Sequence, residues 1–227
     1  INKSCKGLSK AQLKICVFSL HFYFSKILRL DKYLILPRVI SRSSLPVVFS
    51  REDCKKMFFV TKNLKHRIIL TLIYSAGLRV SEVIKMLVCD IDMDRMTITV
   101  RQSKGNKDRC IPLGEIMKKG LIQYLADYNP TSFLVYSMSG RQKPYSIKSI
   151  QNILLKAMLN AGIKKIGASV HTLRHSFATH LLENGANIVK IQQLMGHNDI
   201  KTTMIYTQLV NAHFGKVESP LDTLYKK

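Results

Sequence analysis

The stretch MTITVRQ, residues 96–102 of this 227-residue chain, alternates apolar and polar side chains and is rich in β-branched residues. This pattern predicts a β-strand. The turn sequence SKGNKD follows, and RCIPL at 109–113 predicts a short returning strand. The segments on either side of this hairpin carry helical patterns. The sequence therefore predicts a fold that is mainly α with a small antiparallel β-sheet.

Helix start and stop signals divide the rest of the chain after Pro46. Ser50 and Asp53 resemble a capping box at a helix start, and Gly77 is suited to a left-handed C-cap. Apolar residues between such signals recur at helical spacing. We expect helices over about 62–75, 80–88, 114–128 and 146–161, and three more between 171 and 209 that are punctuated by Gly185 and Gly196.

The first part of the chain has a different organisation. Residues 9–30 predict one long amphipathic helix, and the basic stretch bracketed by Pro37 and Pro46 predicts an extended linker. A single helix has no partner against which to bury its apolar face. We therefore expect residues 1–44 to be a remnant of an N-terminal domain with its linker, and residues 45–227 to form a second domain that ends in a C-terminal tail.

The charge of the chain calls for an anionic partner. Lys and Arg number 36 against 14 acidic residues, which gives a formal net charge of +22 and a pI of about 10.0. Such an excess repels itself in the folded state. Double-stranded DNA is the first candidate partner, an anionic membrane surface is the second, and a generally lysine-rich surface is the alternative to both.

The cysteines indicate the redox compartment. Their number is odd and none of them forms a C-x-x-C pair; they are Cys5, Cys16, Cys54, Cys89 and Cys110. This usage favours reduced thiols in a cytoplasmic protein.

The sequence VHTLRHSFATHLL places three polar groups on one side of a predicted helix. His171, Arg174 and His175 are neighbours because residues three and four apart share a helix face. Two histidines at this spacing suggest zinc, but the H-E-x-x-H pattern requires Glu where Thr172 stands. With no nearby Cys or acid to complete a ligand set, we expect no metal. Taken alone, these residues would favour a solvated helix surface.

Four further segments change this interpretation. SAGLRVSEV places Arg79 at a helix start, where both the helix N-terminus and the guanidinium favour phosphate. SKGNKDR places Lys104 on the hairpin tip, LMGHND places His197 after a helix-ending glycine, and MIYTQL places Tyr206 nine residues later. The ordered set of Arg, Lys, His-x-x-Arg, His and Tyr is much more specific than any member of it.

In this order and at these separations, the residues resemble the tyrosine recombinase/phage integrase family, and most closely its Xer-type bacterial members. The resemblance covers about Leu45 to Leu209, and also the last helix of a core-binding domain at about 9–30. It implies the tyrosine recombinase catalytic-domain fold for residues 45–227. The implied activity is site-specific DNA recombination or integration through a covalent 3′-phosphotyrosyl intermediate. The implied partners are double-stranded DNA and further protomers, as a tetramer on two sites and a dimer on one, with the C-terminal helix passed to a neighbour.

The chemistry that these residues can perform agrees with that implication. Arg79 and Arg174 can clamp the non-bridging oxygens of a phosphodiester, and Tyr206 can attack the phosphorus and conserve the bond energy. His171 is the expected base, and Lys104 is placed to protonate the leaving 5′ oxygen. No metal or nucleotide cofactor is needed for this scheme.

The remaining candidates have supporting roles. His197 is expected to hydrogen-bond a phosphate oxygen or the nucleophile, and Glu82 matches the family's acidic position, which orients Arg79 and His171. His175 and His180 are expected to be structural, and for His175 a supporting position beside the active site stays open as an alternative. Contacts to the DNA are expected from Lys107, Arg109, Arg141 and Lys143. Two alternatives stay open: a truncated DNA-binding fragment without strand exchange, and a nicking-closing enzyme of the type IB topoisomerase kind.

Overall fold

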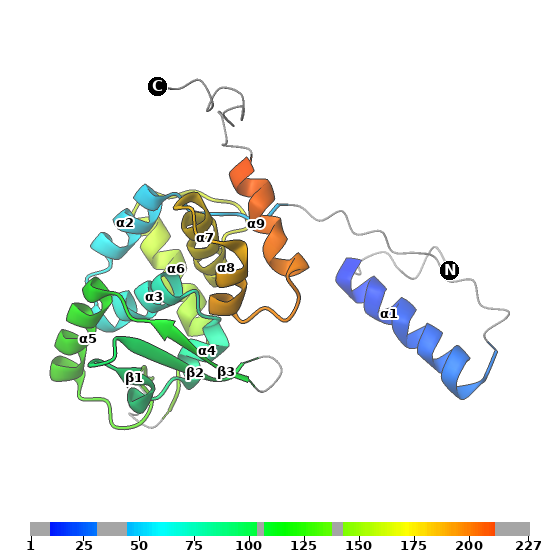
Figure 1. Cartoon of the computed structure of the whole chain (residues 1–227), viewed down its shortest axis with the longest axis horizontal. Helices are drawn as coiled ribbons and strands as arrows, with labels where there is room; N and C mark the ends of the chain where they lie inside the picture. The colour runs from blue at the N-terminus through cyan, green and yellow to red at the C-terminus, as the bar shows by residue number, and fades with distance from the viewer. Residues whose placement is uncertain (1–9, 31–44, 104–106, 138–142, 212–227) are drawn as a thin grey trace, which may run out of the picture. The chain divides into compact units, whose positions relative to one another are not determined.

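Figure 1 shows the computed structural model of the chain. It describes residues 10–30, 45–103, 107–137 and 143–211. The chain divides into two compact units, residues 1–44 and 45–227. In the described ranges, no helix is both long and apolar enough to cross a membrane.

The first unit contains one helical segment. α1 spans Lys10–Phe22 and continues as a π-helical turn, η1, over Tyr23–Ile27. The helix expected over 9–30 is thus found within those limits. Several of its apolar side chains are exposed, among them Ile15 and Phe18. That this unit belongs to a core-binding domain stays a prediction.

The second unit is mainly helical, as predicted. Its helices are α2 (Arg51–Val60), α3 (Leu64–Ala76), α4 (Val80–Lys85), α5 (Glu115–Tyr128), α6 (Ile147–Asn160), α7 (Val170–Glu183), α8 (Ile188–Met195) and α9 (Lys201–Asn211). The helix expected over 80–88 is wrong at its end, because α4 stops at Lys85. The Asp90 carboxylate accepts a 2.8 Å hydrogen bond from the backbone N–H of Leu87, which starts a separate 3₁₀ turn, η3, over Val88–Asp90.

The sheet is three-stranded and antiparallel. Its order is β1 (Ile91–Asp92), β2 (Thr97–Ser103) and β3 (Lys107–Pro112). The hairpin predicted from the alternating sequence is confirmed, and the two-residue β1 is an addition that its length hides from a periodicity argument. In the β2–β3 register Val100 faces Arg109, and the pairing shifts between Val100 and Ser103.

Local signals explain several helix ends. Ser50 Oγ accepts from the backbone N–H of Asp53 at 3.0 Å, and the Asp53 carboxylate accepts from the N–H of Ser50 at 3.1 Å, which confirms the capping box. Gly77 ends α3 with φ 58°, and a Cβ there would lie 2.3 Å from the Phe177 ring. Glycine is required at this position both by its left-handed backbone and by the approach of α7.

The core places α7 beside the elements that carry the remaining site residues. α3 supplies four fully buried side chains at the centre, Ile69, Leu70, Leu72 and Ile73. α7 packs against α3, α8 and α9 (Figure 1), and α8 also contacts β3. A second apolar cluster joins α7, α8 and α9; its buried members are Phe177, Ala178, Ile191, Met195 and Tyr206. The C-terminal tail expected after Asn211 lies outside the described residues.

Candidate active site

Glu82 is the centre of a charged network at the start of α4. Arg79 is the N-cap residue of this helix, and its backbone N–H donates to Glu82 Oε2 at 2.8 Å. The Arg79 guanidinium also donates to Glu82 Oε1 at 2.8 Å. A glutamate in the first helical turn satisfies an otherwise unpaired backbone N–H and favours the positive end of the helix dipole. The sequence around this turn therefore fixes both the backbone and the side chain of Arg79.

Arg109 reaches the same carboxylate from β3. Its Nη1 and Nη2 donate to the two oxygens of Glu82 at 2.9 and 2.8 Å, which is the bidentate geometry of a strong arginine–carboxylate pair. Its Nε donates to the carbonyl of Leu194 at 2.8 Å. The Arg109 side chain is only 9% exposed. This arginine thus connects the hairpin to both α4 and α8.

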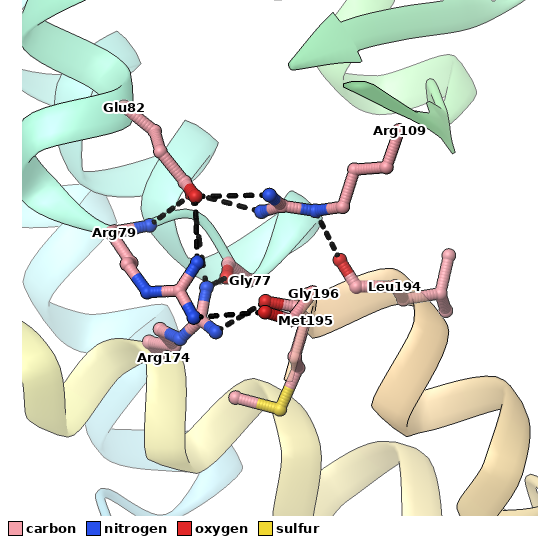
Figure 2. Close-up of polar contacts among 8 residues, drawn as sticks. All are labelled: Gly77, Arg79, Glu82, Arg109, Arg174, Leu194, Met195 and Gly196. Carbon is pink, nitrogen blue, oxygen red and sulfur yellow. Dashed lines mark hydrogen bonds and ion pairs between the residues drawn. The ribbon is translucent and has the colours of Figure 1, made fainter. Parts of the chain in front are cut away.

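The C-terminal end of α8 accepts hydrogen bonds from three arginines (Figure 2). The carbonyl of Leu194 accepts from Arg109, that of Met195 from Arg174 Nη2 at 2.5 Å, and that of Gly196 from Arg79 Nη2 at 3.0 Å. The last carbonyls of a helix have no partner within the helix and carry the negative end of its dipole. Three cations therefore stabilise this helix end, and the helix end in turn fixes the three guanidinium groups.

Gly196 makes this convergence possible. It ends α8 in the left-handed conformation, with φ 62°. A Cβ at this position would lie 3.0 Å from Nη1 of Arg109. A larger residue would therefore strain the backbone and push on the guanidinium that holds Glu82.

Arg174 lies deepest in the network. The residue is 3% exposed, and its Nη1 donates to the carbonyl of Gly77 and lies 3.8 Å from Glu82 Oε2. Burial, with Arg79 beside it, lowers the pKa of Arg174 to about 9, so that the group remains charged at neutral pH. A buried guanidinium of this kind is stable only because carbonyls and a carboxylate surround it.

The electrostatic balance of the network favours an anion. Burial alone would raise the pKa of Glu82, but hydrogen bonds from Arg109 and Arg79 hold it at about 2. Glu82 is therefore ionised at neutral pH, and it is one negative charge against the three positive charges of Arg79, Arg109 and Arg174. A partly buried site with this excess attracts a negatively charged group.

Tyr206 lies next to this positive region in the second apolar cluster. The residue is 2% exposed, and its hydroxyl shares a 2.9 Å hydrogen bond with Nδ1 of His175. Burial raises the pKa of Tyr206 to about 12, although the charges of Arg174 and Arg79 act in the opposite direction. Burial, with His171 and Arg174 nearby, lowers the pKa of His175 to about 4. Both partners are therefore neutral at pH 7.

The other two candidate histidines differ in their surroundings. His171 is exposed at the start of α7, and its pKa is lowered by partial burial and by Arg174 and Arg79. His197 is half-buried just after α8, where its Nδ1 shares a 2.9 Å hydrogen bond with the hydroxyl of Thr203. Burial, followed by Arg174 and Arg79, lowers the pKa of His197 to about 4. Both imidazoles are therefore neutral at pH 7.

The four DNA contacts predicted from the sequence and the hairpin lysine Lys104 differ in where the structure places them. Lys104 and Arg141 lie outside the described residues. Lys107 begins β3, but its side chain is outside the description, and Lys143 is exposed. Arg109, expected to contact DNA, instead directs its donors at Glu82 and Leu194, because the hairpin packs its guanidinium inward.

The sequence left a supporting position open for His175 but did not predict its partner, which is the hydroxyl of the candidate nucleophile. The backbone carbonyls that complete the arginine network were not expected from the sequence. In the part of the chain that the structure describes, no three His, Cys, Asp or Glu side chains gather to hold a metal ion.

Comparison with known proteins gives consistent matches. The sequence model of the phage integrase family matches residues 48–213 of the chain. Tyrosine recombinase XerA of Thermococcus onnurineus (strain NA1) is 37% identical over 223 residues, which are 94% of this chain and 76% of the relative.

Solved structures agree on the fold. The crystal structure of XerA recombinase matches with a TM-score of 0.67 and 25% identity, over 99% of this chain and 79% of that one. The XerH site-specific recombinase, solved in a post-cleavage complex with its palindromic difH substrate, matches with a TM-score of 0.75 and 20% identity, over 93% and 69%. The family match spans most of the chain and includes every described candidate residue, so the chain belongs to the phage integrase family, as a Xer-like tyrosine recombinase.

Proposed function

We propose that this recombinase cleaves and rejoins DNA strands through Tyr206, with Arg79 and Arg174 holding the scissile phosphate. The observation that carries the proposal is the position of Tyr206 beside a partly buried network in which three guanidinium groups face one carboxylate. Site-specific recombination is the activity that the names of the relatives describe. Their names favour strand exchange over a nicking-closing activity or a merely DNA-binding fragment.

The arginines supply the electrostatic part of the reaction. A phosphodiester under attack gains negative charge on its non-bridging oxygens, and planar guanidinium donors stabilise that charge. Arg79 keeps 23% of its side chain exposed and is the member of the network most open to a phosphate. Arg174 lies deeper in the network and stabilises the same charge, with its guanidinium held by the carbonyls of Gly77 and Met195.

Proton transfer completes the scheme. Tyr206 attacks the phosphorus, forms a 3′-phosphotyrosyl bond and releases a 5′ hydroxyl. His171, exposed and neutral at pH 7, accepts the phenolic proton, and Lys104 protonates the leaving oxygen. Thr203 orients His197 through Nδ1, so that Nε2 is the atom we assign to a phosphate oxygen. The phosphotyrosyl bond conserves the energy of the cleaved bond, so the scheme uses neither metal nor nucleotide.

The partners follow from charge and from the relatives. The net charge of +22 supports binding to the backbone of double-stranded DNA. A lambda integrase, also similar in fold, is a dimer bound to a core site. We propose that this chain likewise binds one site as a dimer and assembles as a tetramer on two, in the cytoplasm. In that assembly the segment after Asn211 would contact a neighbouring protomer.

The covalent intermediate is the test of this function. The DNA substrate is first selected from a randomised library of duplexes by its binding to the chain. A nick is then placed near the bound site, so that cleavage releases a short fragment and traps the covalent adduct. We expect a denaturant-resistant protein–DNA adduct, formed equally in the presence of EDTA, whose DNA maps to the peptide that contains Tyr206. Strand cleavage without an adduct, or an adduct on another residue, would contradict the proposal.

A further inference from the structure

The hydroxyl of Tyr206 is enclosed in the arrangement that the structure describes. It shares its 2.9 Å hydrogen bond with His175, and the two rings lie 5.8 Å apart at an angle of 47°. Phe177, Ile191 and Met195 belong to the same buried cluster as the Tyr206 ring. The whole residue is only 2% exposed, so very little of this side chain is open to a DNA backbone in the arrangement described.

The two histidines on this part of α7 therefore do different things. His171 is open to solvent, whereas His175, one turn further along, is half-buried and directs Nδ1 at the phenol. Because the Tyr206 pKa is about 12 and the His175 pKa about 4, the bond joins a neutral phenol to a neutral imidazole, and the ring tautomer decides which of them donates. Such a bond between two neutral partners stabilises the buried position of the ring and leaves the phenol protonated.

We propose that His175 is a positioning residue that holds Tyr206 in a withdrawn position, and that this hydrogen bond must break before Tyr206 can attack DNA. This inference rests on the assignment of Tyr206 as the nucleophile in the proposed function. It predicts that movement of α9, which carries Tyr206, accompanies cleavage. His175 then controls how often the nucleophile is available, and takes no proton in the reaction.

The chain contains a matched comparison on the same helix. Tyr74 and His180 share a hydrogen bond of the same length, 2.9 Å, again between a phenol and Nδ1. Their rings lie 5.8 Å apart, as do those of Tyr206 and His175. The variant His180→Leu therefore removes an equivalent bond from α7 at a tyrosine with no proposed role in cleavage.

Three substitutions of His175 separate hydrogen bonding from bulk. His175→Asn places a polar atom at the same distance along the side chain as Nδ1, and the amide can donate or accept there. His175→Gln places its amide one bond further out, near the position of Nε2. His175→Leu replaces the imidazole with an apolar side chain that reaches about as far as Nδ1, and it removes the hydrogen bond altogether.

The first measurement is nitration of tyrosines by tetranitromethane, followed by mass spectrometry of the peptides, on the full chain. Nitration of Tyr206 should rise about two- to tenfold in His175→Leu and His175→Gln, the population change expected from the loss of one net hydrogen bond. It should stay near the wild-type rate in His175→Asn and in His180→Leu. Tyr124, fully buried in the main core, reports unfolding if its rate rises as well.

The second measurement is the single-turnover cleavage rate at saturating DNA. Breaking the restraint should leave this rate unchanged or raise it by up to about tenfold in His175→Leu and His175→Gln. Unchanged nitration of Tyr206 in both variants would overturn the proposal, as would a cleavage rate that falls about a hundredfold, which would make His175 part of the chemistry. Because nitration needs no DNA, failure of the proposed function leaves this test intact.

Discussion

Both carboxylate oxygens of Glu82 accept hydrogen bonds from Arg109, at 2.9 and 2.8 Å, across 27 residues of sequence. Arg109 in turn holds the carbonyl of Leu194 at the end of α8. This one side chain therefore joins β3, α4 and α8, the three elements on which the position of Arg79 depends. In the proposed reaction its contribution to cleavage would be indirect, because it contacts Arg79 only through Glu82.

Arg109→Lys should reduce both stability and cleavage. Lysine keeps the charge but cannot form two parallel bonds to one carboxylate and a third bond to a carbonyl. We expect a loss of about 1–3 kcal/mol in the free energy of unfolding, measured with urea, because buried acceptors lose their donors. The cleavage rate should fall by about tenfold or more, as expected when an electrostatic group loses its support.

Arg101→Lys is the matched control for this substitution. Arg101 lies on β2 of the same hairpin, is 55% exposed and pairs with Asp90 rather than Glu82. Its replacement should change the free energy of unfolding by no more than about 1 kcal/mol, because lysine keeps a positive charge that can pair with Asp90. Equal effects of Arg109→Lys and Arg101→Lys on the free energy of unfolding would contradict the importance given to the bidentate geometry of Arg109.

The stability of the chain should depend on the ionisation of Glu82. The folded pKa of about 2 lies below the ordinary value of 4.5, so this group stabilises the fold above about pH 4.5, and the contribution is lost as the pH falls toward 2. By pH 3 the loss from this group should be about 2 kcal/mol. Glu82→Gln removes the titration, so its unfolding free energy should fall less between pH 7 and pH 3 than that of the wild type. Equal losses, measured with urea at both pH values, would contradict the assignment.

The two arginines of the proposed phosphate clamp should respond differently to substitution by lysine. Arg174 is buried and bridges the carbonyls of Gly77 and Met195, so Arg174→Lys should lower thermal stability as well as cleavage. Arg79 is more exposed, and Arg79→Lys should lower the cleavage rate by about a hundredfold with a smaller loss of stability. Duplex affinity, measured by fluorescence anisotropy, should change little for Arg79→Lys. An equal loss of affinity and rate would indicate a plain phosphate anchor.

Binding to duplex DNA should depend strongly on salt. The charge of +22 makes phosphate contacts the main source of affinity, and each contact releases a counterion. The logarithm of the binding constant should fall with the logarithm of the salt concentration with a slope of about −0.9 per phosphate contact. Titrations of a random duplex at several salt concentrations measure this slope, and a slope near zero would exclude backbone binding.

The parts of the fold that sequence predicts well are those with local signals. The capping box at Ser50, the left-handed cap at Gly77 and the alternation in β2 each need only a few neighbouring residues. The order of Arg79, His171, Arg174, His197 and Tyr206 was likewise visible along the chain. α4 ended earlier than expected because the Asp90 side chain starts a competing turn.

The rest of the site depends on tertiary contacts that no spacing rule encodes. Arg109 is a basic residue in a basic hairpin, and the sequence therefore predicts that it contacts DNA. Only the packing of β3 against α8 turns its guanidinium inward. His175 and Tyr206 lie 31 residues apart on α7 and α9, and their bond follows from how these helices meet. The carbonyls at the end of α8 are equally invisible, since every residue type carries one.

The trapping of DNA on Tyr206→Phe tests the central claim most directly. Phenylalanine keeps the ring in its apolar cluster and removes only the hydroxyl, so duplex affinity should be preserved. Tyr74→Phe is the matched control, because the hydroxyl of Tyr74 also shares a hydrogen bond with a histidine of α7. With a nicked duplex as substrate and denaturing electrophoresis as readout, we predict a covalent adduct for the wild type and for Tyr74→Phe, and none for Tyr206→Phe. An adduct formed by Tyr206→Phe at the wild-type level would contradict the assignment of Tyr206 as the nucleophile.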